Sequence, residues 1–335
     1  MEGRKLQLAG KSTFLVSLPK RWVTSAGLKA GDTLFVDTES DGSVSIRLSS
    51  GTRPLVRRKS FHERGEETRE HLLRKLIGAY VSGFGLIDVR FSPQRGPFVR
   101  KVAREFCRLV IGPEVIEESP NSILIQDLSD PTELSSEKCL RRMHLTVRAM
   151  LEDAVATLRG DNETLAHDVV LRGQDVNRLY WMVAKQFHLS QGPSTDAVSA
   201  PTIHGHRLIA KLLERIGDHA QRIAAASSTL AGDKALDPKL LEQIGEARSS
   251  AVAILDKAFN ALVTRNIEAA NEAIDARVDH QRLIDGLAHR VAGRRGEALL
   301  ALGSVVDSLG RTAVYAAEIA EEAIDLAVFL NPSAT

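Results

Sequence analysis

The chain has 335 residues, of which 43% are hydrophobic but only 4% are aromatic. This length exceeds one ordinary domain, and the scarcity of aromatic side chains favours Ala- and Leu-rich helices over a β-sandwich or barrel. The formal net charge is +1, but residues 1–60 carry eleven Lys and Arg against five Asp and Glu. A basic N-terminal part on a slightly acidic remainder favours a polyanion partner for the N-terminal part alone.

The cysteine and hydropathy patterns predict a cytoplasmic protein. Cys107 and Cys139 stand in apolar helical contexts and form no C-x-x-C pair, which is typical of reduced thiols in a packed interior. No apolar run reaches the roughly 18 residues of a membrane span, and the first residues lack the apolar segment of a signal peptide. We therefore expect no membrane insertion.

Residues 1–50 predict a small β domain. The expected elements are two strands around a turn at 9–12, a short helix over 20–26 that ends at Gly27, and two strands over 33–37 and 43–48. A unit this short buries little apolar surface alone, so hairpins from a second copy are expected to complete its core. Trp22 is expected to anchor that core rather than to stack on a base.

The segment Ser17-Leu-Pro-Lys-Arg-Trp22, followed by Ala26-Gly-Leu-Lys-Ala-Gly-Asp32, resembles the AbrB/SpoVT swapped-hairpin DNA-binding domain. The resemblance covers residues 4–48 and implies a homodimer that presents basic side chains to DNA. Candidates by position are Arg4, Lys5, Lys11, Lys20 and Arg21, with Arg53, Arg57, Arg58 and Lys59 in the tail that follows. Their contacts would mainly neutralise phosphates, and the alternative for each is an ordinary surface cation.

Residues 51–132 are expected to form a basic linker followed by a small α/β domain. The pattern predicts a helix over 64–82, a strand over 86–91, a helix over 98–110 and a hairpin of strands 115–118 and 123–126. No catalytic constellation occurs in this segment. A spacer, a dimerisation element and a ligand-sensing module all stay open as its role.

From residue 133 the sequence predicts two tandem three-helix bundles, 133–231 and 232–335, as if by internal duplication. The expected helices are 133–159, entered through a cap at 130–132; one marked by an apolar stripe from Leu165 to Phe187; one of about 29 residues from Thr202; and 240–265, 267–291 and 296–329. The fold class is thus multidomain α+β, mainly α.

The third of these helices carries a pair of acids. Ile209, Leu213 and Ile216 fall on one side of the helix, whereas Glu214 and Asp218 project from nearly the opposite side. The two carboxylates are therefore expected on the outside of the bundle, where they can meet one cation or one partner. The alternative is a solvated face with interspersed charges.

The segment Leu213-Glu-Arg-Ile-Gly-Asp-His-Ala-x-x-Ile-Ala224 is similar to the signature helix of the PhoU family, phosphate-uptake regulators built from two repeated three-helix bundles. The similarity covers about 133–330. In that family such acids hold metal ions, which implies a site formed by Glu214 and Asp218 with Asp175 of the preceding helix, and Asp279 as the counterpart of Asp175 in the second repeat. Iron, zinc or another divalent cation would suit these ligands.

The second repeat departs from this pattern, because Gly310 and Val314 stand where the two acids would be. One competent metal cluster at most is expected, unless the second repeat uses Glu318, Glu321 or Glu322. His219 can either ligate or pack, and the pair His204 and His206 is expected in a loop.

The two resemblances together are those of archaeal phosphate-uptake regulators. They imply a cytoplasmic, dimeric, DNA-binding transcriptional regulator of phosphate uptake and homeostasis, with a metal-binding body that senses ligand or contacts phosphate transporter components. The alternative is an adaptor that regulates the transporter by direct contact without binding DNA. A metal-dependent phosphohydrolase is disfavoured, because acids on a convex face lack the cleft and general base that hydrolysis needs.

Overall fold

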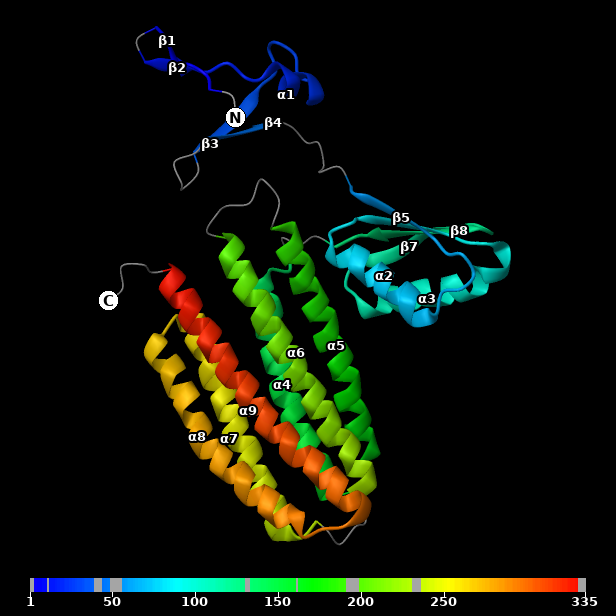
Figure 1. Cartoon of the computed structure of the whole chain (residues 1–335), viewed down its shortest axis with the longest axis vertical. Coiled ribbons are helices and arrows are strands. Elements are labelled where there is room, and N and C mark those ends of the chain that lie inside the picture. Colours follow the sequence, from blue (N-terminus) through cyan, green and yellow to red (C-terminus); the bar gives the residue numbers. More distant parts are fainter. Residues whose placement is uncertain are drawn as a thin grey trace. The chain divides into compact units, whose positions relative to one another are not determined.

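The computed structural model describes residues 3–10, 12–38, 44–48, 56–129, 133–160, 162–190, 199–230 and 236–330. The chain divides into two compact units, Met1–Leu55 and Val56–Thr335. A small β region, a sheet-containing middle segment and a long helical segment follow one another along the chain (Figure 1). This order confirms the predicted mainly helical α+β class.

The N-terminal unit consists of two hairpins and one short helix. Its elements are β1 (Gln7–Ala9), β2 (Thr13–Leu15), α1 (Lys20–Ser25), β3 (Leu34–Thr38) and β4 (Val44–Leu48), with β1 antiparallel to β2 and β3 antiparallel to β4. After α1 the chain turns through Gly27 at φ +68°, a left-handed conformation that glycine adopts without steric cost. Trp22 is half-buried, and no described residue of this unit is fully buried.

The middle segment is a four-stranded sheet with two helices. Its elements are β5 (Arg58–His62), α2 (Arg69–Val81), β6 (Leu86–Arg90), α3 (Gly96–Leu109), β7 (Pro113–Glu118) and β8 (Ser122–Asp127). The strand order is β5-β6-β8-β7, with β5 parallel to β6 and the other pairs antiparallel. Helices α2 and α3 lie on one face of the sheet (Figure 1), where Tyr80, Phe106, Ile123 and Ile125 form the core.

Strand β5 corrects the sequence interpretation, which placed residues 57–59 in a basic tail. The segment Arg-Lys-Ser-Phe-His has one apolar residue, and four of its five side chains are exposed, so it shows no strand periodicity. Its pairing with β6, from Arg58 opposite Leu86 to His62 opposite Arg90, is a non-local contact. Such a contact leaves no local signal in the sequence.

The rest of the chain forms six long helices that lie side by side (Figure 1). They are α4 (Ser136–Ala156), α5 (Glu163–Leu189), α6 (Ser199–Leu230), α7 (Pro238–Thr264), α8 (Ile267–Ala292) and α9 (Gly296–Leu330). The cap predicted at 130–132 lies outside the described residues. The observed N-cap of α4 is Ser135, whose Oγ accepts a hydrogen bond from the Lys138 backbone N–H at 3.4 Å.

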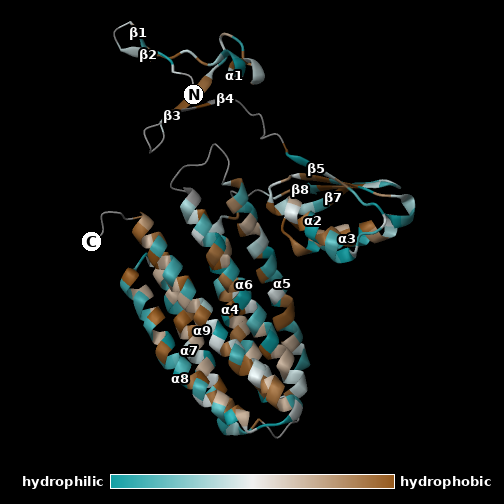
Figure 2. Cartoon of the chain, in the orientation of Figure 1, coloured by the Kyte–Doolittle hydropathy of each residue, from teal (hydrophilic) through white to brown (hydrophobic). Residues whose placement is uncertain are grey.

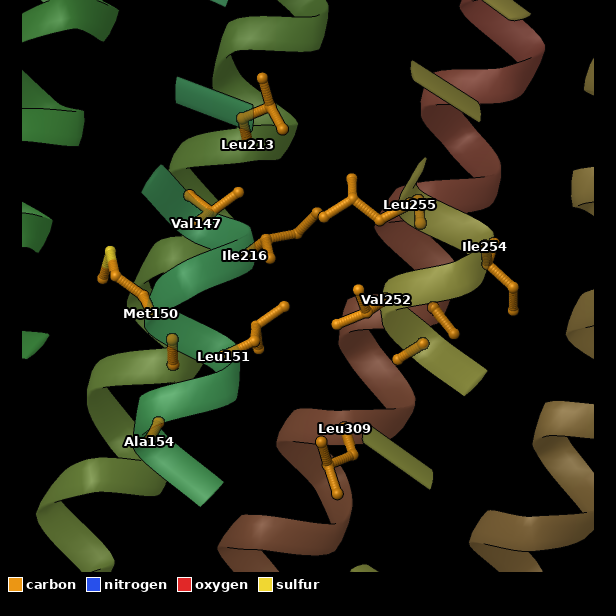
Figure 3. Close-up of a cluster of buried hydrophobic side chains, with 14 of the residues drawn as sticks. Val147, Met150, Leu151, Ala154, Leu213, Ile216, Val252, Ile254, Leu255 and Leu309 are labelled. Atoms are coloured by element: carbon orange, nitrogen blue, oxygen red, sulfur yellow. The ribbon is translucent and has the colours of Figure 1, made fainter. Parts of the chain in front are cut away.

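The two predicted bundles share one continuous core. Hydrophobic and hydrophilic residues are interspersed along the long helices (Figure 2), and the buried hydrophobic side chains of α4, α6, α7 and α9 belong to one cluster. Figure 3 shows Ile216 of α6 and Leu255 of α7 pointing toward one another across the boundary between the repeats. Helix α6 packs against α4 and α5 of its own repeat and also against α9 of the other repeat.

The middle segment is joined to α5 by a buried ion pair. The Lys185 Nζ donates to an Asp127 carboxylate oxygen and, at 2.9 Å, to the Ser129 hydroxyl. The same ammonium lies 4.9 Å from the Tyr80 ring centroid. The two charged side chains are only 5% and 8% exposed, so this pair fixes the sheet to the first bundle within a dry contact.

Candidate functional site

The acids of α6 lie closer to the protein interior than their spacing predicts. Ile209, Leu213 and Ile216 are fully buried, as expected. The Glu214 side chain, however, is only 13% exposed, and Asp218 is half-buried. Neither acid belongs to the hydrophobic core, as predicted, but Glu214 is less exposed than a position on the outer face implies. Its ion-pair partner Lys211 lies beside Tyr180 of α5, a helix of the same repeat.

The carboxylates of Glu214 and Asp218 have different surroundings. The Lys211 Nζ donates to Glu214 Oε2 at 2.6 Å and lies 5.0 Å from the Tyr180 ring centroid. Asp218 Oδ1 accepts a long hydrogen bond of 3.5 Å from Gln221 Nε2. Burial raises the pKa of Asp218, the neighbouring Glu214 raises it further, and the charge on Lys211 opposes the shift.

The other two predicted metal ligands also have cationic partners. The Asp175 carboxylate lies 3.8 Å from Arg178 Nη1, and Asp279 accepts from Arg282 Nη1 at 2.5 Å. The Asp279 side chain is 81% exposed. Within the residues that the structure describes, no three His, Cys, Asp or Glu side chains are grouped so that they could hold a metal ion. The residues present therefore form no ready-made metal site, and metal binding stays a prediction.

The histidines of α6 pack between helices. His219 is 6% exposed, and its Nδ1 lies 3.2 Å from the Ser308 hydroxyl on α9. His206 is equally buried, with Nδ1 2.8 Å from the Ser136 hydroxyl on α4. The expectation that His204 and His206 lie in a loop is wrong, because α6 begins at Ser199 and includes both.

A groove at the seam between α6 and α9 was not anticipated from the sequence. It has a volume of about 550 Å³. Its lining side chains are Lys211, Arg215, Asp218, His219 and Arg222 from α6 and Asp307, Arg311 and Tyr315 from α9. We call it the cationic groove, since four basic side chains line it against two carboxylates. The sequence hint was the position of Arg311, which the repeat alignment places on Arg215.

The predicted DNA-binding residues fall into two groups. Lys5, Lys20 and Arg21 are exposed on the N-terminal unit, as is Arg4, and Lys11 lies outside the described residues. Arg57 and Arg58 belong to the other unit and make contacts within the middle segment. Arg57 Nη1 donates to the Ser82 carbonyl at 2.8 Å, and Arg58 Nη2 donates to Asp88 Oδ2 at 3.0 Å.

The N-terminal unit exposes an unusual amount of apolar surface for its size. Eight large apolar side chains are between 51% and 67% exposed. They are Leu6, Leu8, Phe14, Leu15, Val16, Phe35, Val36 and Val44. So many exposed apolar side chains on a small unit are typical of an interaction surface. Separately, no helix in the described ranges is both long enough and apolar enough to cross a membrane.

The helical segment has the fold of PhoU proteins. The crystal structure of PhoU from Pseudomonas aeruginosa aligns with a TM-score of 0.53 and 20% identity, covering 57% of this chain and 94% of that chain. The phosphate transport system regulatory protein PhoU from Streptococcus pneumoniae aligns with a TM-score of 0.50 and 16% identity, covering 57% and 92%.

Sequence comparison then finds two matching segments. Residues 140–226 match the family described as PhoU domain. Residues 7–57 match the family described as antidote-toxin recognition MazE, bacterial antitoxin, which covers most of the stretch that resembles AbrB/SpoVT. No curated protein matches the sequence. The second repeat shares the PhoU fold but lies outside the range that the sequence match covers. This agrees with its sequence, in which Gly310 and Val314 stand where the two acids would be.

Proposed function

We propose that this protein is a cytoplasmic, DNA-binding transcriptional regulator of phosphate uptake and phosphate homeostasis, and that it is not an enzyme. The observation that carries the proposal is the presence in one chain of a PhoU domain and a basic N-terminal domain of the antitoxin type. The PhoU domain supports a role in phosphate-transport regulation. The basic unit supplies exposed cations for a polyanion.

A homodimer is part of this proposal. The exposed apolar side chains of the two N-terminal hairpins, such as Phe14 and Val36, need a partner surface. A second copy of the same unit offers apolar strands of matching length, and it would place two sets of basic side chains on one DNA duplex. The resemblance to swapped-hairpin domains supports the same arrangement.

An electrophoretic mobility shift with the protein's own upstream DNA tests the proposal. Binding should weaken steeply with salt, because each phosphate contact releases a counterion. Lys20→Ala/Arg21→Ala should weaken binding to all sequences and reduce the salt slope by about 2, about 1 for each lost contact. The matched control Arg277→Ala/Arg295→Ala removes two exposed cations of the second repeat and should bind as the wild type does.

A second candidate function is an adaptor that acts on the phosphate transporter by direct contact. It is favoured by one observation, since the solved protein from Streptococcus pneumoniae that shares this fold is a phosphate transport system regulatory protein. Absence of any shift by the intact protein at low salt would support the adaptor and reject the DNA-binding proposal. Copurification with transporter components would then be the next measurement.

Metal binding is retained as a separate proposal that the regulator does not require. Glu214 and Asp218 would be the ligands, with iron, zinc or another divalent cation as the ion. Two of the predicted ligands are already engaged by cations, because Glu214 is paired with Lys211 and Asp175 with Arg178. Binding would therefore need at least one of these ion pairs to open.

A further inference from the structure

The cationic groove holds more positive charge than its own carboxylates neutralise. Lys211 is paired with Glu214, and Arg311 Nε lies 3.7 Å from Asp307 Oδ1 in an exposed pair. Neither Arg215 nor Arg222 forms an ion pair with any residue in the described ranges. Instead, the Arg215 guanidinium lies 5.6 Å from the Tyr315 ring centroid. The Arg215 side chain therefore reaches from α6 toward α9.

The His219 ring lines the groove beside these cations and is held by its contact with Ser308. Unpaired like charges on one surface repel one another, and a bound anion removes that repulsion.

The two repeats contribute equivalent positions to this groove. In the repeat alignment that places Glu214 on Gly310, Arg215 falls on Arg311 and His219 falls on Tyr315. At these aligned positions each repeat supplies one guanidinium group and one ring. The two pairs meet at the seam between α6 and α9. A ligand between the two guanidinium groups would contact both halves of the duplication.

The acids in the groove narrow the choice of ligand. Guanidinium groups match phosphoryl oxygens in geometry, but they match sulfate equally well. Hydrogenphosphate differs from sulfate because it keeps a P–OH proton near neutral pH, and that proton needs an acceptor. The half-buried Asp218 carboxylate lines the groove and has one long hydrogen bond, so it has free acceptor capacity for this purpose.

We propose that the cationic groove binds a protonated phosphate group, with Arg215 and Arg222 of the first repeat and Arg311 of the second repeat as donors and Asp218 as acceptor. The bound group bridges α6 and α9. Binding itself is independent of the regulatory role, and only its action as an effector rests on the proposed function.

Isothermal titration calorimetry on the full-length protein tests the groove. The probes are inorganic phosphate, adenosine monophosphate and sulfate, each without divalent metal and at about 0.1 M salt, where exposed charges are largely screened. Wild type should bind inorganic phosphate saturably. Sulfate, and adenosine monophosphate, which near neutral pH is mostly a dianion without a P–OH proton, should bind at least about tenfold more weakly, as expected for one charge-assisted hydrogen bond.

The variants separate the groove from general surface charge. Arg215→Gln/Arg222→Gln should weaken phosphate binding by at least about tenfold, and Arg311→Gln should weaken it from the other repeat. Arg277→Gln/Arg295→Gln should leave it unchanged. Asp218→Asn should reduce the difference between the affinity for phosphate and the affinity for sulfate. Circular dichroism on each variant distinguishes lost binding from lost folding.

Two results overturn the proposal. Absence of saturable phosphate binding by the folded wild type rejects the site, and so does an equal loss in the control pair. Equal affinity of the wild type for phosphate and sulfate rejects the role of Asp218. A protein that binds phosphate through Arg215 but shifts no DNA would reject the regulator and leave the groove intact.

Discussion

Lys185 is expected to contribute strongly to stability through its buried ion pair. Its ammonium and the Asp127 carboxylate are both buried, and they join the middle segment to α5. Removal of one partner leaves an uncompensated charge in a dry environment, so Lys185→Ala should lower the free energy of unfolding by about 3–5 kcal/mol. Urea unfolding followed by circular dichroism measures the change.

The control for Lys185 is an exposed pair of the same chemistry. Lys257 donates to Glu272 at 2.8 Å, with both side chains about half exposed to solvent. Lys257→Ala should cost less than about 1 kcal/mol. A double change, Lys185→Met/Asp127→Leu, should recover most of the stability lost in Lys185→Ala, because no charge is then left buried. Equal effects of the two lysine changes would show that the Lys185 contact is solvated.

A second prediction for individual residues is that Glu214 and Asp218 bind a divalent metal ion. Elemental analysis of purified wild type should find a divalent metal, and Glu214→Ala/Asp218→Ala should lose it. Glu272→Ala, on an exposed residue paired with Lys257, serves as the control and should retain the metal content. If wild type and the double variant retain equal metal, the ligand assignment is wrong.

At the scale of elements, the two N-terminal hairpins should control assembly. Leu8 and Val36 are 62% and 64% exposed on β1 and β3. Leu8→Glu/Val36→Glu places charges where a partner strand would pack, so the full chain should shift toward the monomer in sedimentation velocity and lose DNA affinity. A change in neither property would show that these hairpins are not the dimer contact.

The elements could be predicted where their signal is local. The apolar stripe correctly predicts a helix where α6 lies. The turn at Gly27 correctly separates α1 from the strand that follows. Strand β5 could not be predicted, because its five residues are held by pairing with β6 rather than by their own pattern. The start of α6 was missed because a Pro within its first turn reads equally well as the end of a linker.

The same distinction applies to the candidate site. The sequence identified Glu214 and Asp218 as a pair on α6, since their spacing is a property of one helix. It could not show that Glu214 is covered by a neighbouring helix or that Arg215 meets Tyr315. Those facts depend on how other helices pack against α6, which for Arg215 is α9, and that packing is a property of segments apart in the sequence.

At the scale of the molecule, buried histidines should set the dependence of stability on pH. Burial is the largest cause that lowers the pKa of His144, His206, His219 and His280 from their ordinary value of 6.5. The unfolded chain therefore binds more protons than the folded chain in mildly acidic solution. Stability should be full above pH 6.5 and fall as the pH drops through that value.

Urea unfolding between pH 8 and pH 5 measures this loss, which has an upper limit of about 1.4 kcal/mol per pH unit for each proton taken up. His280→Asn should reduce the slope, because His280 is 1% exposed and its two ring nitrogens contact Ser250 and Leu309. Asp218 and Glu322, whose pKa values are raised by burial, act in the opposite direction at lower pH. A flat profile from pH 8 to 5 would contradict the assignment.

The core that runs across the boundary between the repeats also ties the two halves of the helical segment together. Ile216 and Leu255 fill the same interior, so a truncation after the first repeat would strip α6 of its cover and give an insoluble product. The second repeat is then indispensable as scaffolding, although Gly310 and Val314 stand where the two acids would be.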